Sequence, residues 1–189
     1  MRDSTNYNRS MSMDALSADA ECLQSLPQSL AALRNCAFAL QPISVSDPQL
    51  EYCLRLAHQN MNPYLERRGE QFNDVRWCEL APQAEFYLIV DNANSTHENV
   101  GFVSVRSDPD CPPALHIGDV QVKATHQNRG AGSAALQWIE DLAHSRCLSE
   151  LTLNVFRDNP ALRLYERFGF QLIDTQFYKY KMRKTLQRY

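Results

Sequence analysis

The segment VQVKATHQNRGAGS, residues 120–133, carries the most informative pattern in the chain. It joins a predicted strand, Leu115 to Val122, to a predicted helix that starts at Gly130. Successive backbone N–H groups at the start of a helix bind anions, and small residues let a phosphate approach them closely. Arg129 adds a charged donor. The segment therefore predicts a phosphate site; the alternative is that its glycines only make a tight turn.

Two familiar nucleotide motifs are excluded by the residues around this turn. No Gly-Lys-Ser/Thr follows the glycines, so the segment is not a Walker phosphate loop. The glycine spacing does not fit a dinucleotide fingerprint, and the strands predicted before the turn form antiparallel hairpins. The phosphate site is therefore expected on another fold.

Short apolar runs separated by turn residues predict strands on both sides of this segment. The predicted strands are Phe38 to Leu40, ended by Pro42; Phe86 to Val90; Val100 to Arg106; Leu115 to Val122; Leu151 to Phe156; Phe170 to Ile173; and Phe177 to Met182. Predicted helices run from Asp47-Pro48 to a break at Asn62-Pro63, from Tyr64 to Leu80 with a break at Gly69, from Gly130, and from Asn159-Pro160 to Phe168-Gly169. The strand, helix, strand passage at 115–156 is a crossover, which predicts a parallel pair in a mixed α/β fold.

A second motif lies downstream, in the segment NPALRLYERFGF at residues 159–170. It resembles the N-x-x-A-x-x-x-Y-x-x-x-G-F segment of the GNAT N-acetyltransferases, and Gln127-x-x-Gly130-x-Gly132 resembles their Q/R-x-x-G-x-G/A motif. The resemblance covers residues 36–184 and is strongest over 115–170. Ala124 stands where many members carry proline, which affects the stiffness of the loop and not the chemistry.

The resemblance implies a central mixed, mostly antiparallel sheet in which one parallel strand pair, 115–122 and 151–156, splays apart, with helices on both faces. It further implies that acetyl-CoA binds in the splay, with its pantetheine arm paired to the backbone near Val120 and Val122 and contacted by Asn159. The pyrophosphate would lie on the glycine-rich turn. The turn residues expected to bind the cofactor are Gln127, Asn128, Arg129, Gly130, Ala131, Gly132 and Ser133.

Tyr165 is the candidate general acid, because the resemblance places it near the thioester sulfur. A phenol with a pKa near 10 can donate a proton to a departing thiolate. The alternative is that Tyr165 is a core aromatic on a short helix.

His116 is the candidate general base, since an alkylamine must lose a proton before or as it attacks. Alternation along the strand predicts that His116 faces the same way as Gly118, Val120 and Val122, and that Asp119 faces the opposite way. By resemblance, His116 matches a position where members carry a catalytic glutamate or histidine. A water relay is the alternative base.

The amine acceptor is expected between the helical region 48–80 and the loop 107–113, by analogy with the family. Asn62 and Tyr64, next to Met61, are the candidate acceptor-binding residues, together with Asp119. Plain readings remain open: a helix break at Asn62-Pro63, and a structural ion pair for Asp119.

Composition limits the remaining possibilities. The chain has 189 residues, enough for one domain, and a formal net charge of -3 with no lysine or arginine block, which argues against nucleic acid as a partner. No apolar run reaches the length of a membrane span. The six cysteines form no C-x-x-C pair and no zinc pattern, so no metal is expected. The polar first residues lack a secretory signal, which favours reduced thiols and a cytoplasmic location.

Together these features predict an acetyl-CoA-dependent N-acetyltransferase that acts on a small-molecule amine or a protein amino group. The alternative is a non-catalytic acyl-CoA-binding or protein-interaction domain on the same fold. Residues 1–35 are expected to form an N-terminal extension, and residues 36–189 the acetyltransferase domain. A homodimer is compatible with the family, in which dimers are common.

Overall fold

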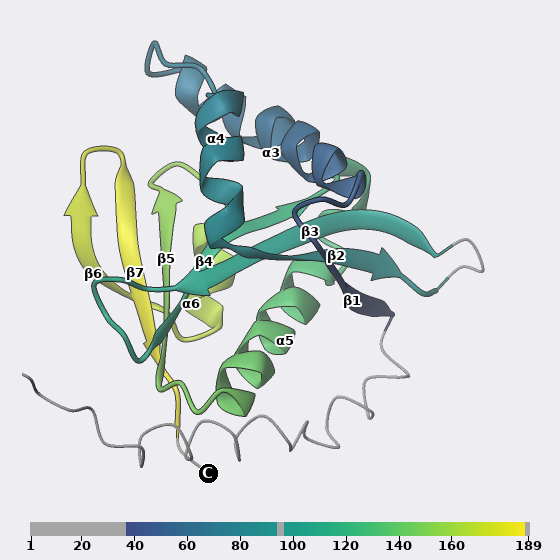
Figure 1. Cartoon of the computed structure of the whole chain (residues 1–189). Coiled ribbons are helices and arrows are strands. Elements are labelled where there is room, and N and C mark those ends of the chain that lie inside the picture. The colour runs from purple at the N-terminus through teal and green to yellow at the C-terminus, as the bar shows by residue number, and fades with distance from the viewer. Residues whose placement is uncertain (1–36, 94–96, 188–189) are drawn as a thin grey trace, which may run out of the picture.

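The computed structural model describes residues 37–93 and 97–187 (Figure 1). The strands are β1 (Phe38–Ile43), β2 (Glu85–Asp91), β3 (Glu98–Ser107), β4 (Ala114–Val122), β5 (Glu150–Phe156), β6 (Gln171–Gln176) and β7 (Lys179–Thr185). The helices are α3 (Gln49–Glu66), α4 (Asp74–Leu80), α5 (Ala131–Ser145) and α6 (Leu162–Arg167), with short 3-10 turns η2 (Ala81–Gln83) and η3 (Ala124–His126). The predicted extension at residues 1–35 lies outside the described residues.

The strands form one seven-stranded sheet in the order β1-β2-β3-β4-β5-β7-β6. Within the described residues, β4 and β5 are parallel and every other neighbouring pair is antiparallel. Helix α5 makes the crossover between the two parallel strands, as the sequence predicts. The mixed sheet and its parallel pair confirm the predicted fold class.

Helices cover both faces of the sheet, and each face has its own apolar core (Figure 1). On one face, α5 packs through Leu136 and Ile139, and α6 through Tyr165, against the buried side chains of β3, β4 and β5. On the other face α3 packs through Cys53 and Leu56 against Phe102 and its neighbours on β2. Burial of these side chains from water is the main force that holds the layers together.

Two predicted breaks are wrong at prolines. Strand β1 runs through Pro42 to Ile43, because β1 is an edge strand, where the missing N–H of proline costs no ladder hydrogen bond on the open side. Helix α3 runs through Pro63 to Glu66, and Pro63 lies in its last turn, close to where the helix ends in any case. The second helix begins only at Asp74, where the Asn73 side chain accepts a hydrogen bond from the Arg76 amide.

Candidate active site

A cavity of about 1180 Å³ lies where β4 and β5 separate. The parallel pairing of these strands covers four residues each and ends at Ile117 and Leu153, although β4 continues to Val122 and β5 to Phe156. Beyond that point, the edge of β4 that faces β5 has no strand partner among the described residues. The predicted splay is therefore present, and it leaves backbone groups free to pair with an extended ligand.

The glycine-rich turn forms one end of this cavity. Of the seven predicted turn residues, those that line the cavity are Gln127, Asn128, Gly130, Gly132 and Ser133. Arg129 does not line it, and Ala131 is buried in the core under α5. Gly130 precedes the first residue of α5 with a φ of 92°, a left-handed conformation that strains residues with a side chain. The N–H groups in the first turn of α5, called the cradle here, have no partners within the helix and lie at this end of the cavity, an arrangement suited to an anion.

The two predicted valines lie between this cradle and the point of separation. Val120 and Val122 both line the cavity. The carbonyl oxygen of Val122 already accepts hydrogen bonds from the side-chain amides of Asn60, at 3.2 Å, and Gln127, at 3.1 Å. Asn60 was not predicted, and it ties α3 to the end of β4. Gln127 therefore fixes the start of the cradle, whereas the backbone near Val120 remains the part available to a ligand.

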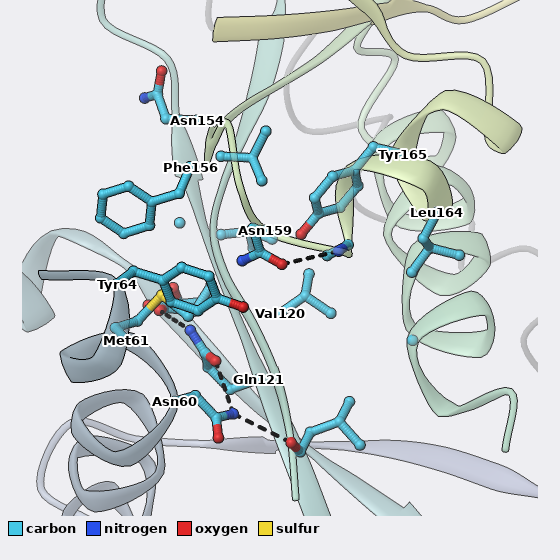
Figure 2. Close-up of a pocket in the computed structure, with 18 of the residues that line it drawn as sticks. Asn60, Met61, Tyr64, Val120, Gln121, Asn154, Phe156, Asn159, Leu164 and Tyr165 are labelled. Carbon is cyan, nitrogen blue, oxygen red and sulfur yellow. Dashed lines mark hydrogen bonds between the residues drawn. The ribbon is translucent and has the colours of Figure 1, made fainter. Parts of the chain in front are cut away.

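Tyr165 and Asn159 lie on the opposite side of the splay (Figure 2). The side chain of Asn159 accepts a hydrogen bond from the Ala161 amide at 2.9 Å, which shapes the turn before α6. Tyr165 is 8% exposed, packs edge-on against Phe170, and points its hydroxyl into the cavity near Asn159. Burial, aided by the charge of Asp119, raises the pKa of Tyr165. The phenol therefore keeps its proton at neutral pH and can act as a donor.

The prediction that His116 and Asp119 lie on opposite faces of the sheet is wrong, because a β-bulge interrupts β4. Ser104 pairs with Asp119 but Val105 pairs with Ile117, so Gly118 is an extra residue in β4. A bulge reverses the alternation of side chains along the rest of the strand. His116 therefore shares its sheet face with Asp119, and not with Val120 and Val122 as predicted.

His116 is held by a buried chain of hydrogen bonds. Its Nδ1 lies 2.9 Å from Oγ1 of Thr152, and that hydroxyl donates to the Asp108 carboxylate at 2.6 Å. Because the single hydroxyl proton of Thr152 goes to Asp108, Nδ1 of His116 must carry a proton and donate it to Thr152. The lone pair of the imidazole therefore lies on Nε2. All three side chains are buried.

The ionisation of this chain follows from its surroundings. Burial lowers the pKa of His116 to about 4, and the charge of Arg106 acts in the same direction. Burial alone would raise the pKa of Asp108, but hydrogen bonds from the Thr152 hydroxyl and the Asp110 amide outweigh it and hold that pKa below its ordinary value. At neutral pH the three hydrogen-bonded side chains are therefore a neutral imidazole at His116, a hydroxyl at Thr152 and a carboxylate at Asp108.

The structure separates the two acceptor residues predicted on α3. Tyr64 lines the cavity and stacks on Phe156 of β5, with ring centroids 5.6 Å apart (Figure 2). Asn62 does not line it: its amide donates to Glu66 at 2.7 Å and accepts from the Phe72 amide at 2.9 Å. Asn62 thus fastens the connection between α3 and α4. The alternative of a helix break at Asn62-Pro63 is wrong as well, because α3 continues to Glu66.

Asp119 faces the cavity, and its carboxylate is already held by the protein. It accepts hydrogen bonds from Ser104 at 2.8 Å and Gln121 at 3.1 Å. Burial raises its pKa in spite of these bonds. Within the described part of the chain, no ion pair of Asp119 is found within 4.0 Å, so the structural ion pair considered from the sequence is absent there.

Neither metal ligation nor membrane insertion is indicated by the described residues. Residues 37–93 and 97–187 contain no group of three or more histidine, cysteine, aspartate or glutamate side chains suited to a metal ion. In the same residues, no helix has the length and apolar character that a membrane crossing requires.

Comparison with known proteins adds family evidence to this geometry. The model of the acetyltransferase (GNAT) family matches residues 53–170, which is more than half of the chain and includes both the turn and α6.

Solved structures share the fold at low sequence identity. Ard1 from Thermoplasma volcanium superposes with a TM-score of 0.64 at 18% identity, covering 80% of this chain and 99% of its own. The PaiA N-acetyltransferase from Thermoplasma acidophilum, in complex with coenzyme A, gives 0.60 at 15% identity over 79% and 99%. A chain of the NatC complex bound to Gag peptide and CoA gives 0.59 at 19% identity over 79% and 99%. At these identities the likeness concerns the fold.

Proposed function

The chain belongs to the acetyltransferase (GNAT) family, and from this premise we propose that it transfers the acetyl group of acetyl-CoA to a primary amine by direct attack in a ternary complex. The observation that carries the proposal is the convergence on one cavity of the amide cradle, the open edge of β4, the Tyr165 hydroxyl and His116. These are the groups that acyl transfer from a phosphate-bearing thioester requires.

The residues present fit acetyl-CoA as the acetyl donor. The cradle before α5 suits a pyrophosphate, and the unpaired edge of β4 near Val120 suits the amide groups of a pantetheine arm. Asn159 lies beside that path, across the splay (Figure 2). Acetyl-CoA supplies an acetyl group already activated as a thioester.

The protein's own groups then handle two protons. The amine attacks from the α3 side, and Nε2 of His116 takes the proton that the nitrogen loses as it bonds to the acetyl carbon. The Tyr165 hydroxyl gives its proton to the sulfur as the bond between carbon and sulfur breaks. Asp108 and Thr152 act through His116 as positioning residues, because they fix the tautomer that leaves Nε2 free.

The direct test is acetyl transfer to amines. The protein is incubated with acetyl-CoA and a panel of small amines and peptides, and CoA thiol release is measured together with the acetylated product. We expect saturable, amine-dependent release. If acetyl-CoA binds but none of the amines is acetylated, the chain is a non-catalytic acyl-CoA-binding domain instead.

Replacing Gly132 with valine tests the cradle. A Cβ on Gly132 would lie 3.1 Å from Cδ2 of Leu164, so a valine side chain would crowd the cavity between the turn and α6, both of which line it. Because charge-assisted hydrogen bonds to the pyrophosphate would be lost, we expect the Kd for acetyl-CoA to rise about 10- to 100-fold. Calorimetric titration measures this. Gln137→Val, on the exposed side of the same helix, is the control for folding and should bind acetyl-CoA normally. If both variants bind acetyl-CoA with equal affinity, the phosphates do not bind at this turn.

Replacing Thr152 with valine tests the positioning chain. Valine keeps the shape of the side chain but removes the hydroxyl between His116 and Asp108, so the imidazole loses its fixed tautomer. We expect kcat/KM to fall about tenfold and its dependence on pH to change. Thr152→Ser, which restores the hydroxyl, should recover both. If Thr152→Val keeps the full rate and an unchanged pH profile, the hydrogen bonds that join His116, Thr152 and Asp108 have only a structural role.

We also propose the broader setting suggested by the sequence. Residues 36–189 form the catalytic domain, with residues 1–35 as an extension, and the protein works in the cytoplasm without nucleic acid or membrane partners. Deleting residues 1–35 and measuring mass in solution tests whether the extension supports a homodimer.

A further inference from the structure

The charges around the cavity are unbalanced. Among the described residues that line it, Asp119 is the single carboxylate. The cations that line it are Arg76, Arg106, Arg163, Arg167 and Lys179. Arg163 and Arg167 belong to α6, on the cofactor side, and Arg76 pairs with Glu79 at 3.6 Å. Neither assignment applies to Arg106 or Lys179.

Arg106 is half-buried and lies beside His116. Arg106 and His116 are paired residues of β3 and β4, and both line the cavity and a smaller pocket next to it. The two carboxylates of that pocket are otherwise engaged: Asp108 accepts from Thr152, and Asp110 pairs with Lys181 at 3.2 Å. In residues 37–93 and 97–187, no ion pair of Arg106 lies within 4.0 Å. A guanidinium in this position is suited to bind an anion.

Lys179 lies on the other wall of the same space. It pairs with Phe156 across β7 and β5, and its Nζ lies 4.8 Å from the centroid of the Phe156 ring. That ring stacks on Tyr64 of α3, so Lys179 belongs to the acceptor side of the cavity. The described residues place no carboxylate within 4.0 Å of its ammonium group either.

The phosphates of acetyl-CoA do not account for Arg106. Arg106 is level with His116 near the start of β4, whereas the cradle follows Val122 at the end of that strand. Six residues of extended strand separate the two positions by about 20 Å. Arg106 therefore faces the acceptor and not the pyrophosphate.

We propose that the acceptor is a small amine that also carries a carboxylate, such as an amino acid, and that Arg106 binds this carboxylate with Lys179 as the second cation. The inference rests on the proposed function and names its substrate class. The amino group of such a molecule lies at Nε2 of His116, and its carboxylate is directed toward Arg106. A bound carboxylate also offsets the charge of Arg106 near His116, which makes the imidazole a better base when the correct acceptor is present.

Matched acceptors test the proposal. Phenylalanine, phenylalanine amide and phenethylamine share a skeleton and differ in the carboxylate; β-alanine with its amide, and a short peptide, extend the panel. CoA release is measured with the full chain and with Arg106→Gln, Lys179→Met and the control Arg55→Gln, whose side chain is exposed and paired with Glu51. We expect kcat/KM about 10-fold or more higher for acids than for their amides. Arg106→Gln and Lys179→Met should each remove most of that preference, and Arg55→Gln should not.

Equal use of acids and amides, or transfer to the peptide alone, would overturn the substrate class and leave acetyl transfer intact. A second measurement does not depend on turnover. The CoA-bound protein is titrated calorimetrically with N-acetylphenylalanine, N-acetyl-β-alanine and their amides. Tighter binding of either acid, lost in Arg106→Gln, supports the carboxylate site even if no amine is acetylated. Binding of neither acid above its amide overturns it.

Discussion

Replacing Tyr165 with phenylalanine is expected to lower kcat about 100-fold or more while acetyl-CoA still binds. Loss of a general acid typically costs a factor of about 10² to 10⁴. The substitution removes only the hydroxyl, and the ring keeps its packing against Phe170. Because burial raises the pKa of Tyr165, the phenol is protonated at neutral pH and ready to donate to the departing sulfur. Turnover and acetyl-CoA affinity, measured on the same preparation, separate chemistry from binding.

Tyr180→Phe is the matched control for this variant. Tyr180 on β7 is partly buried against the same core but does not line the cavity, so its hydroxyl has no expected part in the reaction. We expect normal turnover from it. Full turnover by the Tyr165 variant would return Tyr165 to the role of a core aromatic.

Replacing His116 with glutamine should lower kcat/KM about 100-fold or more if Nε2 is the base, because glutamine cannot take up the proton. With its pKa at about 4, His116 is neutral throughout the physiological range. Its own protonation should therefore reduce the rate only as the pH falls toward 4. Rates measured from pH 4.5 to 9 on both proteins check this. Similar rates and similar pH profiles would indicate a water relay.

The low pKa of His116 also predicts that the stability of the parent protein depends more steeply on pH than the stability of His116→Gln. Between pH 4 and 6.5, the unfolded chain binds a proton at His116 that the folded protein does not, so this residue makes stability increase with pH across that window. Through His116, the free energy of unfolding is about 3 kcal/mol lower at pH 4 than at pH 7. Urea unfolding at several pH values should show a shallower dependence for His116→Gln. Gln137→Val, an exposed and non-titrating position on α5, is the control and should keep the pH dependence of the parent protein.

The sequence predicts the scaffold of the site better than its acceptor side. The turn at 127–133 and the α6 segment are local patterns, in which glycine, proline and asparagine have direct backbone consequences. The crossover through α5 predicts the parallel pair in the same way. Those features place the cradle and Tyr165 on opposite sides of one splay, as the structure has them.

The orientation of His116 was missed because it depends on a single extra residue. Alternation along 115–122 was interpreted without a break, whereas the bulge at Gly118 reverses the faces on either side of it. Gly118 itself is the signal in that strand, because an isolated glycine inside a strand often marks a bulge. His116 contacts Thr152 because the two residues are paired across the parallel strands β4 and β5. The sequence predicts that these strands are parallel but does not predict their register, so this contact could not be predicted. For the contact between His116 and Thr152, the signal in the sequence is a threonine between two leucines in a buried strand, Leu151-Thr152-Leu153.

The most direct test of the account is calorimetric titration of the full chain with acetyl-CoA, followed by CoA. We predict saturable binding of acetyl-CoA near micromolar Kd, about -8 kcal/mol, since the cradle and the β4 edge together hold the phosphates and the pantetheine arm. Weaker binding by Gly132→Val in the same experiment would locate the phosphates at α5. Absence of binding by either compound would contradict the account, because every step proposed for His116 and Tyr165 begins with acetyl-CoA in that splay.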